Sequence, residues 1–418
     1  MISSFKKILP TITFLLMINY LSASEWVDLG TPGPSEPSWE VDAISASSLE
    51  ISFQLKGFIK EQLRDGKNRI SFPSSVPILE RGAPNLPRMA RSIIIPDLAH
   101  MKLSILSTEF VDIDMSEIEP SKGNLTRDIV PATIPYTYGK VYEANEFYPS
   151  DIAFLREPYI LRTLRGQAVV FQPVQYNPVQ RILRVYTHIN ISIQEDGLSH
   201  VNPLTRRPSN AGSLEFDHMY RDHFINFPTN ERYDILSEEG PMLVISHGEF
   251  LDEMQTFVDW KNYKGIPTEM VDVSEVGDVE AMEQFIEDQY YENGIAFVLL
   301  VGDIAQIESI RRSNGNGSNS PSDNSFSFVA GDDYYPDLMI GRFSAETGEH
   351  VQTMVERTIS YEMNPDPEGI WYRKGAGFAS NQGPGDDGEY DDEHMDNIRE
   401  LLLAYTYDEI DQVYDPNG

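Results

Sequence analysis

The sequence predicts a β-rich domain followed by an α/β domain with a parallel sheet and helices on both faces. Between about residues 48 and 197, apolar and polar residues alternate with period two, as in half-buried strands. From residue 242 onward, short apolar strands alternate with amphipathic helices, a pattern typical of parallel sheets with right-handed crossovers. The chain of 418 residues also exceeds the length at which single cores stop growing, so more than one domain is expected.

Residues 1–24 have the pattern of a secretory signal peptide. Lys6 and Lys7 precede an apolar stretch from Ile8 to Leu21, and small residues then supply a cleavage site before Glu25. The apolar stretch is shorter than the roughly 20 residues of a membrane-spanning helix. We therefore expect export, with no transmembrane helix.

The β-rich domain is predicted over residues 48–197 as a sandwich-like or barrel-like fold. Residues 25–47, rich in Pro, Ser and Gly, are predicted to be a linker before it. Residues 198–232 lose the alternation and are predicted to connect it to the next domain. The clearest strand has one apolar face, formed by Val185, Thr187, Ile189, Ile191 and Ile193.

The α/β domain is predicted over residues 233–418, and the turn residues at its end indicate that the fold is incomplete at the C-terminus. Gly265 and Gly294 are expected to cap two of its helices. Residues 311–324, rich in Ser, Asn and Gly, are expected to form an exposed loop. The strands are expected at 242–246, 269–273, 296–301, 338–341, 375–380 and 410–414, and the helices at 251–263, 279–291, 348–361 and 392–405.

Composition excludes some classes of function. The chain carries 66 acidic and 32 basic residues, a net charge of -34, which repels phosphate backbones, so we expect no nucleic-acid partner. An excess of carboxylates suits hard cations such as calcium, although a solvated acidic surface gives the same composition. The chain contains no Cys, so it has neither disulfides nor a thiol nucleophile.

Acidic residues lie after one predicted strand and before the next. Asp303 comes directly after one strand, and Asp333 and Asp337 lie in a turn before the next. Alternating carboxylates with intervening carbonyl groups fit the oxygen ligands that calcium prefers. A solvated turn capped by Asp explains the same residues.

A third acidic segment, residues 381–392, lies between a strand and a helix. Its carboxylates either cap the helix or form a pocket for a cationic group, since a carboxylate pairs with guanidinium in bidentate geometry. His247 and His394 lie at the same predicted edge of the fold, but no nucleophile accompanies either one. The sequence contains no Gly-x-Ser-x-Gly, phosphate-loop or His-Glu-x-x-His motif.

Two ordered sets of residues resemble the gingipain family of cysteine peptidases. In the α/β domain they are 257–262 with Gly265, 298–303, 340–343, 357–361 and 414–416. In the β-rich domain they are 82–87, 95–96, 172–178 and 183–186. The resemblance implies a bacterial zymogen, secreted or at the cell surface, in which a propeptide precedes a caspase-like α/β peptidase.

The resemblance also implies an activity and its partners. Such an enzyme hydrolyses protein or peptide substrates through a Cys and His pair, and its own propeptide acts as an intramolecular inhibitor. Neither the Cys of that pair nor the motif that carries its His occurs in this sequence, so no catalytic residue is assigned here. The other interpretation is a non-catalytic exported module, for binding or surface assembly, on a peptidase scaffold.

The family resemblance implies a calcium site made of five residues. Asp303, Asp333 and Asp337 would bind through carboxylates, and Ala330 and Tyr335 through backbone carbonyl groups. It further implies processing after Arg232, which precedes Tyr233 at the start of the α/β domain. Arg206 and Arg207 compete as cleavage sites.

The resemblance implies a pocket for the substrate residue before the scissile bond, the P1 residue. Asp391 best matches the Asp that binds the P1 guanidinium in arginine-specific members, with Asp392 as a possible substitute. Gln382 stands where those members have a glutamate near the catalytic His, so that charge is absent.

Overall fold

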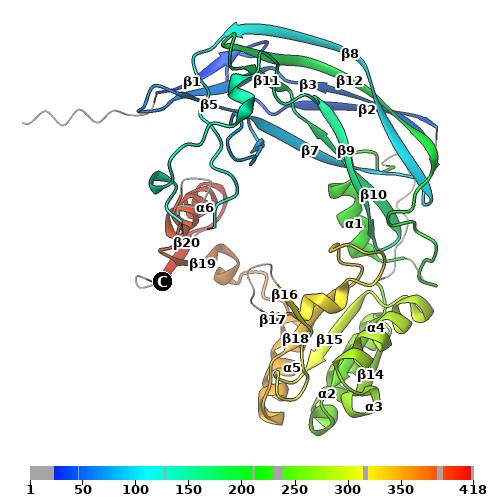
Figure 1. Cartoon of the computed structure of the whole chain (residues 1–418). Helices are drawn as coiled ribbons and strands as arrows, with labels where there is room; N and C mark the ends of the chain where they lie inside the picture. The colour runs from blue at the N-terminus through cyan, green and yellow to red at the C-terminus, as the bar shows by residue number, and fades with distance from the viewer. Residues whose placement is uncertain are drawn as a thin grey trace, which may run out of the picture.

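The computed structural model describes residues 23–45, 47–126, 129–209, 212–228, 239–313, 319–383 and 389–415. These form a β-rich half and an α/β half, and Figure 1 shows them as the upper sheets and the lower right-hand layer of helices and strands. Most of the predicted signal peptide and the predicted processing site at Arg232 and Tyr233 lie outside the described residues.

The β-rich half contains three sheets. One has the order β1-β4-β5, the second β6-β7-β10-β9, and the third β11-β12-β3-β2, with β8 also paired to β12. All of these pairings are antiparallel. The strands are β1 (Ala23–Asp28), β2 (Ser38–Ser45), β3 (Ser48–Gln54), β4 (Gly57–Gln62), β5 (Asn68–Ser71), β6 (Val76–Pro77), β7 (Pro87–Ile94), β8 (Ala99–Asp114), β9 (Ala153–Leu161), β10 (Leu164–Phe171), β11 (Val174–Asn177) and β12 (Ile182–Leu198).

The segment predicted to be a linker, residues 25–47, is largely strand. β1 pairs with β4, and β2 pairs with β3 along most of its length. The linker prediction was therefore wrong for this segment. Pro, Ser and Gly mark the turn between the two strands, whereas the pairing itself depends on residues elsewhere in the chain.

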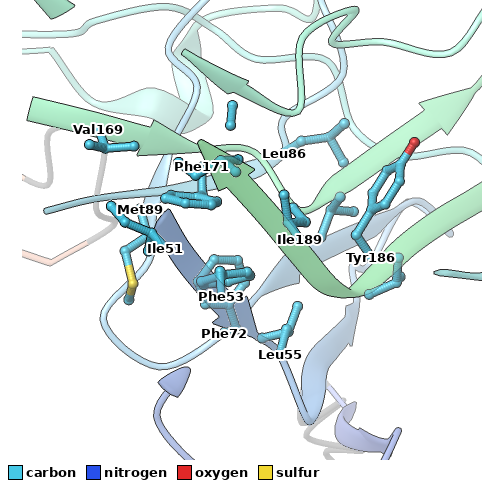
Figure 2. Packing of buried hydrophobic residues seen from close by; sticks show 14 of the residues in the cluster. Ile51, Phe53, Leu55, Phe72, Leu86, Met89, Val169, Phe171, Tyr186 and Ile189 are labelled. Carbon is cyan, nitrogen blue, oxygen red and sulfur yellow. The ribbon is translucent and has the colours of Figure 1, made fainter. Parts of the chain in front are cut away.

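The core of the β-rich half lies between the second and third sheets, as a sandwich requires. Phe53 of β3 and Phe171 of β10 are fully buried, and their rings stack with centroids 5.0 Å apart. Figure 2 shows these rings among aliphatic side chains such as Ile51, Leu55 and Ile189. The alternation in β12 thus places Val185, Ile189, Ile191 and Ile193 in this core, as predicted, whereas Thr187 is only half-buried.

Short helices follow or interrupt the strands. The segment predicted as a connection contains α1 (Leu214–His223), which packs Phe216 and Tyr220 against Tyr159 and Leu161 of β9. Two 3₁₀ helices, η1 (Pro131–Thr133) and η2 (Lys140–Glu143), lie between β8 and β9.

The α/β half is built on a parallel sheet of order β14-β13-β15-β18. Helix α4 covers one face of the sheet, while α2 and α5 cover the other. Alternate residues along β13 explain the two layers, because Leu243 and Ile245 pack with α4 and Val244 packs with α2. The elements are β13 (Met242–Ser246), η3 (Gly248–Phe250), α2 (Leu251–Lys264), β14 (Thr268–Asp272), α3 (Val273–Val276), α4 (Val279–Asn293), β15 (Phe297–Val301), β16 (Arg311–Ser313), β17 (Asn319–Pro321), η4 (Asp323–Ser327), β18 (Met339–Phe343) and α5 (Gly348–Met363).

Residues 311–313 and 319–321 of the loop predicted at 311–324 are exposed, as expected, but they form paired strands. β16 and β17 pair as a short antiparallel hairpin, and η4 follows with Phe326 buried. Composition alone did not indicate the buried helical turn.

The last strands form a sheet of their own. β19 (Lys374–Ser380) pairs in parallel with β20 (Glu409–Asp415), and α6 (Asp391–Tyr405) packs on both, after η5 (Ile370–Arg373). Figure 1 shows this unit apart from the four-stranded sheet. The sequence predicted parallel strands here but not their division into two sheets. Across the described part of the chain, no helix has the length and apolarity that a membrane crossing requires.

Candidate functional site

Three strands of the parallel sheet end in polar residues at the same edge. His247 follows β13 and donates its backbone N–H to Val301 of β15. Asp303 follows β15, and its carboxylate accepts a hydrogen bond of 2.8 Å from the Ser344 hydroxyl after β18. That bond holds the pKa of Asp303 below its usual range. In open parallel sheets this edge is where ligands bind.

Arg342 of β18 links this edge of the parallel sheet to η4. Its guanidinium makes a bidentate pair with Asp323, at 2.8 and 2.7 Å, and also donates to the carbonyl groups of Gly302 and Ile307. This pairing lowers the pKa of Asp323. Because the guanidinium also donates to the Ser309 hydroxyl, Arg342 has a positioning role for the loop after β15.

The acidic turn before β18 is buried at Asp337 and half-buried at Asp333, whereas Asp332 is exposed. Asp337 is fully buried, and its Oδ2 accepts the backbone N–H groups of Val329 at 2.9 Å and Ala330 at 2.6 Å. Asp333 accepts the N–H of Tyr335 at 2.9 Å. Burial raises the pKa of Asp337 to about 7, although the amide donors oppose that shift.

The remaining oxygens of these carboxylates bind the β-rich half. Asp333 Oδ2 accepts the N–H of Ile160 at 2.8 Å, and Asp337 Oδ1 accepts the N–H of Arg162 at 2.7 Å. Ile160 lies at the end of β9, an edge strand of its sheet, and Arg162 follows in the turn to β10. Alternate N–H groups of an edge strand have no partner within the sheet. Here the N–H groups of Ile160 in the strand and of Arg162 in the following turn donate to carboxylates.

Arg162 is fully enclosed in this contact. Its side chain is fully buried and donates to the carbonyl groups of Gly294, Ile295 and Asp337 at 2.9, 3.0 and 2.8 Å. The guanidinium also lies over the ring of Phe216, 4.8 Å from its centroid. Burial lowers the pKa of Arg162 from its usual value. The sequence did not single out this residue, because an Arg in a two-residue hairpin turn carries no local signal of what it contacts.

Aromatic residues surround the contact. The rings of Tyr159 and Tyr335 stack with centroids 3.8 Å apart, and the Tyr159 hydroxyl lies 2.6 Å from His223 Nε2. Burial lowers the pKa of His223, so the neutral imidazole is favoured here. The two halves therefore share a buried interface of aromatic rings and hydrogen-bonded polar groups, in which Arg162 Nε has no partner among the described residues.

The geometry of the acidic turn does not fit the calcium site that the resemblance implied. Among the described residues, no three acidic or histidine side chains lie close enough to hold a metal ion, so Asp303, Asp333 and Asp337 do not form a cluster. Asp333 and Asp337 already accept backbone amides with both of their oxygens. Ala330 and Tyr335, the expected carbonyl ligands, donate their N–H groups to Asp337 and Asp333.

The candidate P1 pocket lies at the carboxyl end of β19. Ser380, the last residue of β19, donates its hydroxyl to Asp391 Oδ2 at 2.7 Å, and Asp391 is the first residue of α6. The backbone N–H of Gln382 donates to the Ser380 hydroxyl at 3.2 Å, and the N–H of Asp391 donates to the Gln382 carbonyl at 2.8 Å. Gln382 and Asp391, which the sequence placed in or next to the pocket, thus lie together with Ser380.

Other acidic side chains accept backbone N–H groups at the start of α6. The side chain of Asp392 accepts the N–H of Glu393 at 3.0 Å. Glu393 accepts the N–H of Tyr390 in a capping box. His394 pairs with Glu389 at 2.8 Å and not with Asp391. The capping interpretation therefore applies to part of this segment, and the Asp391 carboxylate lies at the end of β19.

Comparison with known families decides the assignment. Residues 41–233 match the family model Propeptide_C25, and residues 235–417 match the model of Peptidase family C25. The chain belongs to peptidase family C25. The gingipain resemblance is thereby confirmed.

Curated relatives of this C25 chain come from Porphyromonas gingivalis. Gingipain R1 is 34% identical over 388 residues, which cover 90% of this chain and 38% of the relative. Gingipain R2 is 32% identical over 425 residues, which cover 99% of this chain and 56% of the relative. The chain thus spans between about two fifths and three fifths of the length of these relatives.

Two solved structures are also similar. A complex of Porphyromonas gingivalis RgpB pro- and mature domains matches with 32% identity and a TM-score of 0.40, covering 46% of this chain and 98% of that one. The Arg-specific cysteine proteinase gingipain R matches with 34% identity and a TM-score of 0.39, covering 44% of this chain and 43% of that one.

Proposed function

We propose that this chain is the N-terminal portion of a secreted cysteine endopeptidase zymogen that hydrolyses peptide bonds after a basic P1 residue, above all Arg. The observation that carries the proposal is the consecutive match of a propeptide model and a peptidase model along one chain. A propeptide placed before its peptidase is the organisation of a zymogen. The names of the relatives agree with it, since those proteins are gingipains.

The β-rich half would serve as intramolecular inhibitor and folding aid. Its hairpin buries Arg162 and aromatic residues against the α/β half. Groups that are buried and hydrogen-bonded in this way make separation of the halves costly, because each would need a new partner. Removal of the β-rich half would then accompany activation.

Substrate binding would depend on Asp391. Its carboxylate is oriented by the Ser380 hydroxyl, and we infer that it would pair with a P1 guanidinium. The residues described here would bind and orient the substrate. The thiolate for attack on the peptide carbonyl must come from a Cys, and these 418 residues contain none.

Export and processing complete the proposal. The signal peptide would be removed before Glu25, and processing after Arg232 would release a form that begins at Tyr233. Cleavage after Arg would agree with a P1 pocket that prefers Arg.

The test is N-terminal sequencing of the protein expressed from its complete reading frame in a bacterial host, together with an activity assay. We expect an exported form that begins at Tyr233 and appears together with peptidase activity. An exported protein that is neither processed nor active would instead favour a non-catalytic binding or surface-assembly module.

A further inference from the structure

The tip of the β9–β10 hairpin combines two features that a simple turn does not need. Arg162 is fully buried, although Arg is among the residues least often buried unless it is paired. Its backbone has a φ of +51°, a conformation that disfavours residues with a Cβ and that two-residue hairpins usually supply with Gly or Asn. Strained backbone of this kind persists where the surroundings fix it, and it concentrates at functional contacts.

Carboxylate and carbonyl oxygens of the α/β half accept hydrogen bonds from this tip. Two N–H groups of the tip, on Ile160 and Arg162, meet the carboxylates of Asp333 and Asp337. The guanidinium meets carbonyl groups at the end of α4 and before β15, at Gly294 and Ile295. A helix C-terminus carries unpaired carbonyl groups and partial negative charge, so it favours a cation.

The α/β half also donates a hydrogen bond to the hairpin tip. The hydroxyl of Tyr290 in α4 donates to the Arg162 carbonyl at 3.0 Å. Each polar group of the Arg162 backbone therefore has its partner on the α/β half. The hairpin residues Ile160 and Leu161 add apolar side chains to cores that also contain residues of the α/β half or of α1.

We propose that the tip of the β9–β10 hairpin is the docking element that holds the β-rich half on the α/β half, with Arg162 as its anchor, and that Asp333 and Asp337 serve this docking and not cation binding. The inference deepens the proposed zymogen, because it names the contact that would retain a cleaved propeptide. The contact itself does not depend on cleavage or on activity.

A second arginine of the chain provides a matched control. Arg181 has a φ of +58° in the turn between β11 and β12, and its side chain is exposed. Arg162→Gly and Arg181→Gly both relieve the backbone strain and both remove one positive charge. Only Arg162→Gly removes a side chain from the interface.

The experiment is hydrogen–deuterium exchange of the intact chain, followed in peptides that cover residues 158–164, 290–296 and 328–338. We expect Arg162→Gly to raise exchange in all three by about tenfold or more, because the amides of a weakened contact open more often. Arg181→Gly is expected to leave them unchanged. Equal exchange in the two variants overturns the anchor.

Two further arms decide the remaining points. Arg162→Lys keeps a cation in the site and guards against a folding failure of the Gly variant; it is expected to raise exchange in the same peptides by a smaller factor, and no rise would contradict the anchor. Wild-type protein with calcium chloride or with a chelator is expected to exchange equally in residues 328–338. Protection by calcium there would restore the carboxylates as cation ligands and overturn the docking assignment. None of these readouts requires peptidase activity, so their failure is separate from failure of the proposed function.

Discussion

The hydroxyl of Tyr159 in β9 and the Nε2 of His223 in α1 lie 2.6 Å apart, at the boundary of the two halves. The imidazole also packs edge-on against Phe224 and faces the ring of Tyr335. No acidic side chain pairs with it among the described residues, and burial lowers its pKa. Protonation therefore places a charge in a poorly solvated site.

Stability should fall as the pH drops because of this histidine. A pKa that is lower in the folded state means that the unfolded chain binds the proton more tightly, so stability is lost as the pH falls below the unfolded value of about 6.5. We expect the melting temperature of His223→Gln to rise relative to that of wild type as the pH is lowered from 7.5 to 5. Asp337, whose pKa is raised, contributes the opposite dependence equally in both proteins. Tyr159 and Tyr335, which face the imidazole, have raised pKa values and stay neutral in this range.

His218 in the same helix is the control, since its side chain is exposed. His218→Gln is expected to keep the pH dependence of wild type. If both variants follow the wild-type curve, the buried imidazole does not contribute to it.

Replacement of Asp337 by Ala should strongly destabilise the chain. The change leaves the N–H groups of Arg162, Val329 and Ala330 without their acceptor in a buried site. Unsatisfied buried donors cost about 1–3 kcal/mol each, so we expect a loss of roughly 3 kcal/mol or more in the free energy of unfolding. Urea unfolding at pH 8 measures it, above the pKa of about 7.

Asp332→Ala is the matched control, because that side chain is exposed in the same turn. It is expected to change the free energy of unfolding by no more than about 0.5 kcal/mol. A similar urea midpoint for the two variants would show that the buried carboxylate does not stabilise the fold.

The core of the β-rich half should depend on Phe53. Its ring is fully buried and lies 5.0 Å from the ring centroids of both Trp39 and Phe171. Phe53→Ala is expected to cost about 3–5 kcal/mol through lost burial and the cavity left behind. Trp39 fluorescence during urea unfolding reports on this half directly. Val179→Ala, at an exposed turn, should leave the transition in place.

Local patterns predicted the α/β half well. Helix α2 was expected to end at Gly265, and that glycine caps it with a φ of +95°. Gly294 ends α4 in the same way, with a φ of +66°. Both the period of a helix and the glycine that ends it are read within a few residues, so no tertiary information is needed.

Contacts between distant segments were not predictable in this way. β1 and β2 lie in a stretch whose composition indicates a linker, and only pairing with β3 and β4 makes them strands. Asp333 and Asp337 carry a pattern of oxygen ligands, but their partners are amides some 170 residues earlier in the chain. Single-sequence spacing shows which groups are available and not which groups they meet.

Ser380 was another residue that the sequence did not single out, although it ends a predicted strand. Its hydroxyl fixes the Asp391 carboxylate. In the protein expressed from its complete reading frame, Ser380→Ala is expected to lower kcat/KM for Arg substrates by roughly tenfold, since a hydrogen bond to a charged group contributes about 1.5–3 kcal/mol. An unchanged kcat/KM would remove Ser380 from the pocket.

The most direct test of the central claim is the P1 specificity of the processed protein, measured with fluorogenic peptides that carry Arg, Lys or an uncharged P1 residue. We expect a preference for Arg that Asp391→Asn reduces by about a hundredfold or more, because the bidentate charged pair is lost. Asp411→Asn, which removes an exposed carboxylate from β20, should keep the preference. Equal turnover of the three peptides by wild type, or an unchanged preference in Asp391→Asn, would contradict it.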